Sequence, residues 1–276
     1  LGKKKGKERY VVPIPDGKRV RFEIAGPNGV PRDGTVSRTG AVCLLCGTPV
    51  PLTYIRAEGK AGRMGAQLMA IAAEGPRQRY YLAPTEEHEK AADVPRPDDA
   101  PEAELPEQAL GFRVQGYGMC TWADLFTNRQ LTALTTFSDL LQPVRDRIIA
   151  DGATLDYACA VSTYLAFAIS KLSDNLSILC AWRPDAIKES VNHVFARQAL
   201  SMVWDYAEGD PFVQGPCDLA TGAGWIARAV AGLPTSPSGA AYQADAAARE
   251  YLHHVVATDP PYYDNVGYAD LSDYFY

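Results

Sequence analysis

The stretch Tyr251-Leu-His-His-Val-Val-Ala-Thr-Asp-Pro-Pro-Tyr262 decides how we expect this chain to fold. It opens with a short apolar run that ends at Asp259, and such a run is typical of a buried β-strand. In open α/β sheets, ligands bind outside the carboxyl ends of the strands. The tetrad Asp259-Pro260-Pro261-Tyr262 stands at such an end, so we expect it to line a binding site. A rigid Pro-Pro turn that binds nothing is the alternative.

The residue types of the tetrad suit methylation of an aromatic amine. The exocyclic amine of adenine or cytosine is a poor nucleophile because its lone pair is delocalised into the ring. Two acceptors that hold its N–H groups favour the pyramidal geometry needed to attack a methyl sulfonium. Asp259 would supply a carboxylate oxygen, and Pro260 a backbone carbonyl whose direction the Pro-Pro step fixes. Tyr262 would stack on a base that has left the duplex.

The same residues carry a resemblance to a known family. Asp-Pro-Pro-Tyr at a strand end is similar to the signature of amino-methyltransferases that act on adenine N6 or cytosine N4 with S-adenosylmethionine (AdoMet). The longer run from Thr258 to Phe275 resembles one branch, the large adenine-specific DNA methylases with an inserted zinc ribbon. Three further stretches resemble that branch: Gln115-Gly-Tyr-Gly-Met119, Asp124-Leu-Phe-Thr-Asn-Arg-Gln130 and Phe195-Ala-Arg-Gln-Ala-Leu-Ser-Met-Val-Trp-Asp205.

The resemblance implies an AdoMet-dependent enzyme that methylates DNA, with adenine N6 favoured. It implies an α/β fold: an incomplete Rossmann-like catalytic portion with an inserted zinc-ribbon-like β module and a helical insert. Asp245 precedes the tetrad by about the interval at which the family places an acidic contact to the adenine ring of AdoMet. An ordinary surface aspartate is the alternative for this residue.

The Gly-rich cofactor turn of the family has no convincing counterpart in this sequence. Thr221-Gly-Ala-Gly224 has no strand leading into it, so we expect it to begin a helix instead. The resemblance puts the cofactor turn before residue 1, and the chain is therefore expected to be a central fragment. Such a fragment would be inactive alone.

Composition divides the chain into four parts. Residues 1–83 are predicted to form a β module, 84–110 an acidic Pro-rich exposed linker, 111–240 a helical insert and candidate target-recognition region, and 241–276 the catalytic-domain strand with its tetrad. Apolar spacing and capping residues predict helices over 128–141, 155–179, 190–207 and 224–231.

The β module contains a candidate metal site. Cys43-Leu-Leu-Cys46-Gly47 has the spacing and trailing glycine of a zinc knuckle. A structural zinc site needs a second pair of ligands, and the other cysteines do not form one. The resemblance suggests that the partner knuckle precedes residue 1, which leaves Cys43 and Cys46 as half of a site. Two free thiols on a turn are the alternative.

Net charge is −6, but the charge is unevenly distributed. The first 21 residues hold eight Lys and Arg residues against two acidic ones, a local charge of +6. Such a basic arm can meet phosphate whatever the total charge, and a solvated basic edge explains it equally well. No stretch approaches the ~20 apolar residues of a membrane helix. Six cysteines in a core-rich chain fit a reducing compartment, so we expect a cytoplasmic protein.

Four other functions stay open at this point. Cytosine N4 suits the tetrad as well as adenine N6 does. Methylation of RNA, or of a protein amide, uses a related Asn/Asp-Pro-Pro-Tyr element. A non-catalytic nucleic-acid-binding module that keeps a relic of the tetrad belongs to another class. An intact Gly-rich cofactor turn elsewhere in the gene would favour an enzyme over a binding module.

Overall fold

The computed structural model describes residues 1–185, 189–234, 239–260 and 265–276. Within these residues every sheet is a two-stranded antiparallel hairpin. The pairs are β1 (Tyr10–Asp16) with β2 (Arg19–Ala25), β3 (Gly40–Val42) with β4 (Pro49–Pro51), β5 (Ile71–Glu74) with β6 (Arg79–Leu82), and β7 (Trp182–Pro184) with β8 (Glu189–Val191). The β-rich character predicted for residues 1–83 is present, with one helix, α1 (Leu52–Lys60), among the strands.

The β1–β2 hairpin forms as the turn residues predict. Asp16 pairs with Arg19 across a two-residue turn, and Gly17 has a φ of 59°, which glycine adopts without steric cost.

Most of residues 84–110 are exposed, as expected of a linker, but the segment also contains a helix and buried residues. A short helix, α2 (Glu86–Ala91), begins at Thr85 with a capping box in which Thr85 and His88 bond each other's backbone amides. Further along, Leu105 is buried and its amide donates to the carbonyl of Cys120 at 2.7 Å. The segment therefore packs in part against the rest of the protein despite its prolines.

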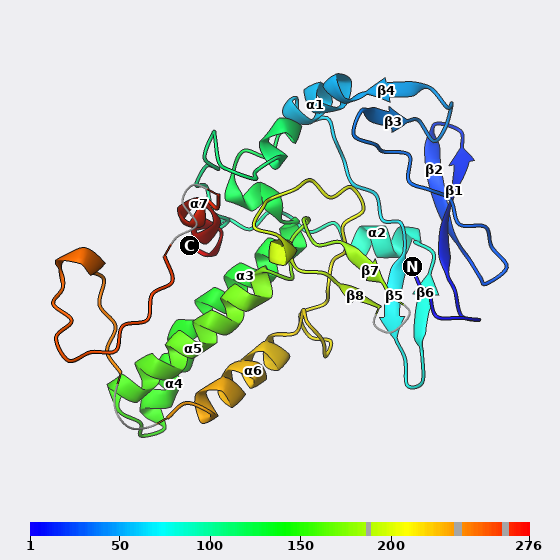
Figure 1. Ribbon diagram of the computed structural model, residues 1–276. Helices are drawn as coiled ribbons and strands as arrows, with labels where there is room; N and C mark the ends of the chain where they lie inside the picture. Colours follow the sequence, from blue (N-terminus) through cyan, green and yellow to red (C-terminus); the bar gives the residue numbers. More distant parts are fainter. Residues whose placement is uncertain (186–188, 235–238, 261–264) are drawn as a thin grey trace.

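Four helices form the body of the molecule, and they lie side by side in Figure 1. Thr127, Thr154 and Asp218 cap three of them through side-chain oxygens. Their bounds are α3 (Asn128–Asp139), α4 (Leu141–Ala150), α5 (Leu155–Ser173) and α6 (Leu219–Ala231). The helix predicted over 128–141 is confirmed with its Thr127 cap. The one predicted over 155–179 ends earlier, at Ser173.

The helix predicted over 190–207 is wrong. Strand β8 occupies its start, a 3-10 turn, η3 (Val194–Ala196), follows, and the rest is irregular. Tertiary contacts override the helical spacing: the Asp174 carboxylate accepts from the amide of Phe195, and the carbonyl of Leu200 accepts from the amide of Arg113. Leu200 is completely buried in this irregular segment.

One main core lies among the irregular segments near the C-terminal end of α5, where Tyr274 bonds the carbonyl of Ser173. Two 3-10 helices, η1 (Val114–Tyr117) and η2 (Trp122–Leu125), supply much of it. The C-terminal elements α7 (Tyr268–Ser272) and η5 (Asp273–Phe275) complete it with Leu271 and Tyr274. The last residues of the chain are therefore attached to the helical body (Figure 1).

Candidate functional site

The part of the tetrad that the structure describes is fully accessible. Asp259 and Pro260 end segment 239–260, in which every residue is exposed. This segment extends away from the helices on the opposite side of the molecule from β1 and β2 (Figure 1). No described residue forms a hydrogen bond or an ion pair with the Asp259 carboxylate. Pro261 and Tyr262 lie outside the described residues.

The buried strand predicted before the tetrad does not form. Val255 is 101% exposed and Leu252 72% exposed, and His253 has a φ of 65°, far from an extended conformation. A strand needs neighbouring strands to bond its amides and carbonyls and a layer to cover its side chains. None of the hairpins described above lies beside these residues, so their apolar side chains stay in solvent.

The chain packs into the main core further along from the tetrad, at Leu271 and Tyr274. Tyr274 is buried, and its hydroxyl donates a 2.8 Å hydrogen bond to the carbonyl of Ser173. Its ring contacts Trp122, Phe126 and Phe195. Burial raises the pKa of the Tyr274 phenol well above its ordinary value. The sequence showed an aromatic-rich run here, but its spacing gave no sign that Tyr274 would be the buried member.

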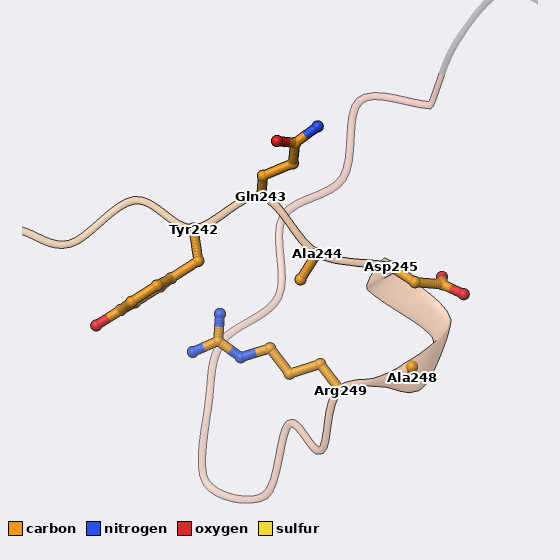
Figure 2. A pocket seen from close by; sticks show the side chains of 6 residues that line it. All are labelled: Tyr242, Gln243, Ala244, Asp245, Ala248 and Arg249. Carbon is orange, nitrogen blue, oxygen red and sulfur yellow. The ribbon is translucent and has the colours of Figure 1, made fainter.

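Asp245 begins a 3-10 turn, η4 (Ala246–Ala248), and accepts a hydrogen bond from the amide of Ala247 at 2.9 Å. It lies at an open hollow of about 440 Å³ that its own segment forms. Figure 2 shows Arg249 and Tyr242 facing each other across this hollow, while the Asp245 carboxylate points away from the arginine. All the residues that line this hollow come from segment 242–249. The hollow is therefore open to solvent and is not an enclosed pocket.

Cys43 and Cys46 lie in the turn between β3 and β4, and the turn has the shape that a metal knuckle needs. The amide of Gly47 donates to the carbonyl of Cys43 at 2.9 Å, and Gly47 adopts a φ of 72°. Cys46 Sγ lies 3.1 Å from Thr48 Oγ1. Hydrogen bonding to Thr48, with a contribution from Cys43, lowers the pKa of the exposed Cys46 thiol, which favours the thiolate that binds metal.

The rest of a zinc site is not found in the described part of the chain, which holds no cluster of three or more His, Cys, Asp or Glu side chains suited to a metal. Cys43 and Cys46 alone could supply two of the four ligands of a structural zinc site, and the half site stays a prediction. Figure 1 places β3 and β4 on the far side of the helical body from segment 239–260. The candidate metal ligands and the tetrad are thus not brought together.

Thr221 to Gly224 form the first turns of α6 after the Asp218 cap. Asp218 accepts from the amides of Ala220 and Thr221, and these bonds consume the donors that a phosphate or cofactor would need. The prediction that this Gly-containing stretch begins a helix is confirmed.

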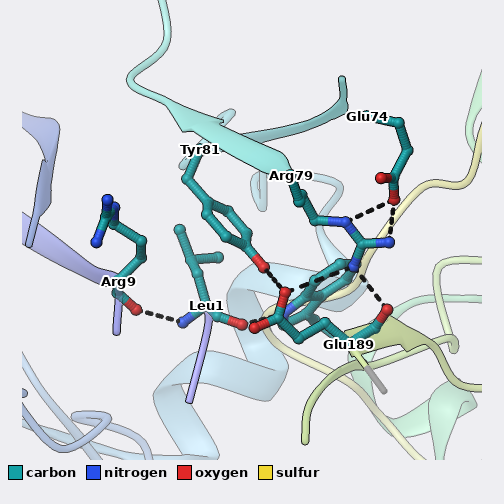
Figure 3. A network of polar contacts seen from close by, with 7 residues as sticks. Leu1, Arg9, Glu74, Arg79, Tyr81 and Glu189 are labelled. Carbon is teal, nitrogen blue, oxygen red and sulfur yellow. Dashed lines mark hydrogen bonds and ion pairs between the residues drawn. The ribbon is translucent and has the colours of Figure 1, made fainter. Parts of the chain in front are cut away.

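Sequence reasoning missed a polar network between the β module and the β7–β8 hairpin (Figure 3). Arg79 pairs with Glu74 and donates to the carbonyl of Glu189, and the Tyr81 hydroxyl donates to the Glu189 carboxylate. The indole of Trp182 donates to the carbonyl of Leu1 at 2.7 Å. Apart from Glu74, the partners in each bond are more than 100 residues apart in sequence, so no local pattern could have indicated these contacts.

Comparisons of the chain with protein-family models, with curated proteins and with solved structures found no match. Across the described residues, no helix is both long and apolar enough to cross a membrane. A functional assignment must therefore come from the residues of the chain itself.

Proposed function

We propose that this chain is part of an AdoMet-dependent DNA methyltransferase that methylates an exocyclic amine, with adenine N6 favoured over cytosine N4. The observation that carries the proposal is the tetrad Asp259-Pro260-Pro261-Tyr262, together with the run to Phe275 that resembles the adenine-specific methylases with a zinc ribbon. A four-residue motif of Asp, Pro and Tyr is rare by composition alone.

In this proposal Asp259 and Pro260 hold the two N–H hydrogens of the target amine. A carboxylate and a carbonyl can both accept, and neither offers a donor that would compete. The Asp259 carboxylate is exposed and has no partner among the described residues, so it is available to a substrate. The Tyr262 ring would stack on the extruded base.

AdoMet, when bound, would supply the electrophilic methyl group. Of the described residues, Asp245 fits one contact to it, because one carboxylate oxygen caps η4 and the other is free to accept. The hollow at Asp245 is lined by its own segment only and is open to solvent, so it cannot enclose AdoMet. The chain thus fits part of an AdoMet site, and we propose that further residues of the gene product complete it.

The proposed catalytic fold is Rossmann-like α/β, in which residues 251–258 would form a strand between neighbours that are not among the described residues. The exposed apolar side chains of Leu252, Val255 and Val256 support this part of the proposal, because such side chains are usually covered. Cys43 and Cys46 would hold half of a structural zinc site. All six cysteines are free thiols, which supports the cytoplasm as the compartment.

The test is to incubate the complete gene product with unmethylated DNA and tritiated AdoMet, digest the DNA and separate the nucleosides. Label in N6-methyladenine supports the proposal as stated, and label in N4-methylcytosine would move the target to cytosine. Transfer to RNA or protein and not to DNA, or no transfer with tight DNA binding, would overturn it in favour of one of the other readings.

A further inference from the structure

A dense group of basic residues lies outside the proposed methylation site. Eight of the 27 Lys and Arg residues occur within the first 21 positions, while the whole chain carries a net charge of −6. We define the basic arm as residues 3–21, which comprise a lysine turn (3–7), strand β1 and the start of β2. Figure 1 shows this arm at one edge of the molecule, on the opposite side from segment 239–260.

Backbone hydrogen bonds define the conformation of the lysine turn. The amide of Lys7 donates to the carbonyl of Lys4 at 2.9 Å, and Gly6 adopts a φ of 75°. Below the turn, Gly2 and Arg9 exchange backbone hydrogen bonds of 3.2 and 3.1 Å. The four lysines of the turn, Lys3, Lys4, Lys5 and Lys7, are all exposed.

The base of the lysine turn is fixed to the β7–β8 hairpin. Trp182 donates to the carbonyl of Leu1, and Gly2 packs so closely that a Cβ would lie 2.8 Å from the Glu189 carboxylate. Figure 3 shows Leu1 within this network. Ammonium groups on an anchored turn lose less conformational entropy on meeting a ligand than those on a free tail.

A second basic end lies at the other end of β1. Lys18 lies in the β1–β2 turn, and Arg19 is the first residue of β2. Arg21 projects from the same face of β2 as Arg19. Arg21 is paired with Glu23, but Lys18 and Arg19 form no ion pair with any described residue. The seven residues of β1 separate the two basic ends by about 23 Å at a rise of about 3.3 Å per residue.

The structure points to a partner with regularly spaced negative charge along a rigid path. Two basic ends about 23 Å apart can each meet a phosphate of a rigid polyanion, and duplex DNA carries a phosphate about every 3.4 Å of helix axis along each strand. We infer that the basic arm binds the phosphate backbone of duplex DNA flanking the target base. The choice of DNA rests on the proposed function, whereas the phosphate chemistry rests on the arm alone.

The position of the arm predicts what it contributes. Segment 239–260 lies on the opposite side of the molecule, so a duplex must extend beyond the target base before the arm can contact it. Backbone contacts carry no sequence information, so the arm would raise affinity equally for all sequences. Each phosphate contact releases counterions and makes the negative slope of log affinity against log salt steeper by about 0.9.

The experiment measures binding of the complete gene product to a labelled duplex by fluorescence anisotropy between about 50 and 200 mM salt. The test variant is Lys3→Gln, Lys4→Gln, Lys5→Gln, and the matched control is Lys60→Gln, Lys90→Gln, Arg228→Gln, which removes three exposed charges from α1, α2 and α6. We expect the slope of log affinity against log salt to become shallower by about two to three in the test variant and to stay unchanged in the control. Circular dichroism of both variants checks that they fold.

Methyl transfer at low salt and saturating DNA separates this inference from the proposed function. Label transfer by the test variant with weakened DNA binding supports both. Unchanged DNA binding in the test variant overturns the arm inference and leaves the methyltransferase proposal intact. Salt-dependent binding through the arm without any methyl transfer in the wild type overturns the proposed function alone. Loss of binding to anionic vesicles or to single-stranded RNA, but not to duplex DNA, would overturn the arm inference in favour of that other partner.

Discussion

The hydroxyl of Tyr274 donates a hydrogen bond to the carbonyl of Ser173, the last residue of α5, across 2.8 Å. This bond connects the residues that follow the tetrad to the longest helix of the body. Leu271, one turn earlier, is buried in the same core. The chain that follows the tetrad is therefore anchored in a packed core, while the residues before the tetrad are exposed.

Removing this bond should lower stability measurably. We expect Tyr274→Phe to cost about 0.5–1.5 kcal/mol, the usual net value of a hydrogen bond, and Tyr274→Ala about 3–5 kcal/mol through the cavity it leaves. Urea unfolding checks both values. Tyr276→Phe is the matched control, because Tyr276 is fully exposed, and an equal loss in the control would contradict the role given to Tyr274.

The buried phenol also predicts an alkaline pH dependence. In the folded state the pKa of Tyr274 is raised, so the folded protein keeps this proton while the unfolded chain releases it above about pH 10. The stability that Tyr274 contributes is thus complete below pH 10 and falls as pH rises above it, by at most about 1.4 kcal/mol per pH unit. Tyr274→Phe should show a smaller fall. Parallel profiles for the two proteins would disprove the assignment.

The cysteines should differ in reactivity. Burial raises the pKa of Cys180 to about 12 and that of Cys217 to about 11, whereas the pKa of the exposed Cys46 is lowered by hydrogen bonding to Thr48. Because the thiolate is the nucleophile, Cys46 of the metal-free protein should be alkylated first at neutral pH and the two buried thiols only after unfolding. Peptide mapping after brief iodoacetamide treatment measures the order. Native-state labelling of Cys217 at the rate of Cys46 would be inconsistent with this arrangement.

The knuckle turn predicts the metal content. If Cys43 and Cys46 form half of a four-cysteine site, the complete gene product should hold about one zinc per chain. The double variant Cys43→Ser, Cys46→Ser should lose it, and Cys120→Ser, which changes an exposed thiol elsewhere, should retain it. Metal analysis that finds no zinc in the wild type would leave the two thiols as ordinary turn residues.

Some of the fold could be predicted from sequence because its determinants are local. Thr127 and Thr154 accept from amides three residues ahead, and Gly17 closes a tight hairpin turn, so neighbouring residues fix these features. The Cys43–Cys46 turn belongs to the same group. In each case the residue types already satisfy the backbone groups that the element leaves free.

Other parts depended on residues distant in sequence. The helical spacing over 190–207 gave way to pairing with β7 and to burial of Leu200 against residues near 113. The Arg79–Glu189 network and the Tyr274 anchor join segments separated by about 100 residues. The run at 251–258 has the composition of a strand, but a strand is stable only beside other strands, and the described chain places none there.

Asp259→Ala in the complete gene product tests the central claim most directly. Because Asp259 is proposed to accept a hydrogen from the target amine only as the transition state develops, its loss should reduce methyl transfer from tritiated AdoMet by about 100-fold or more and leave DNA affinity nearly unchanged. Asp98→Ala, which removes an exposed carboxylate elsewhere, serves as the matched control and should retain full activity. Normal turnover by the Asp259→Ala protein would contradict the account.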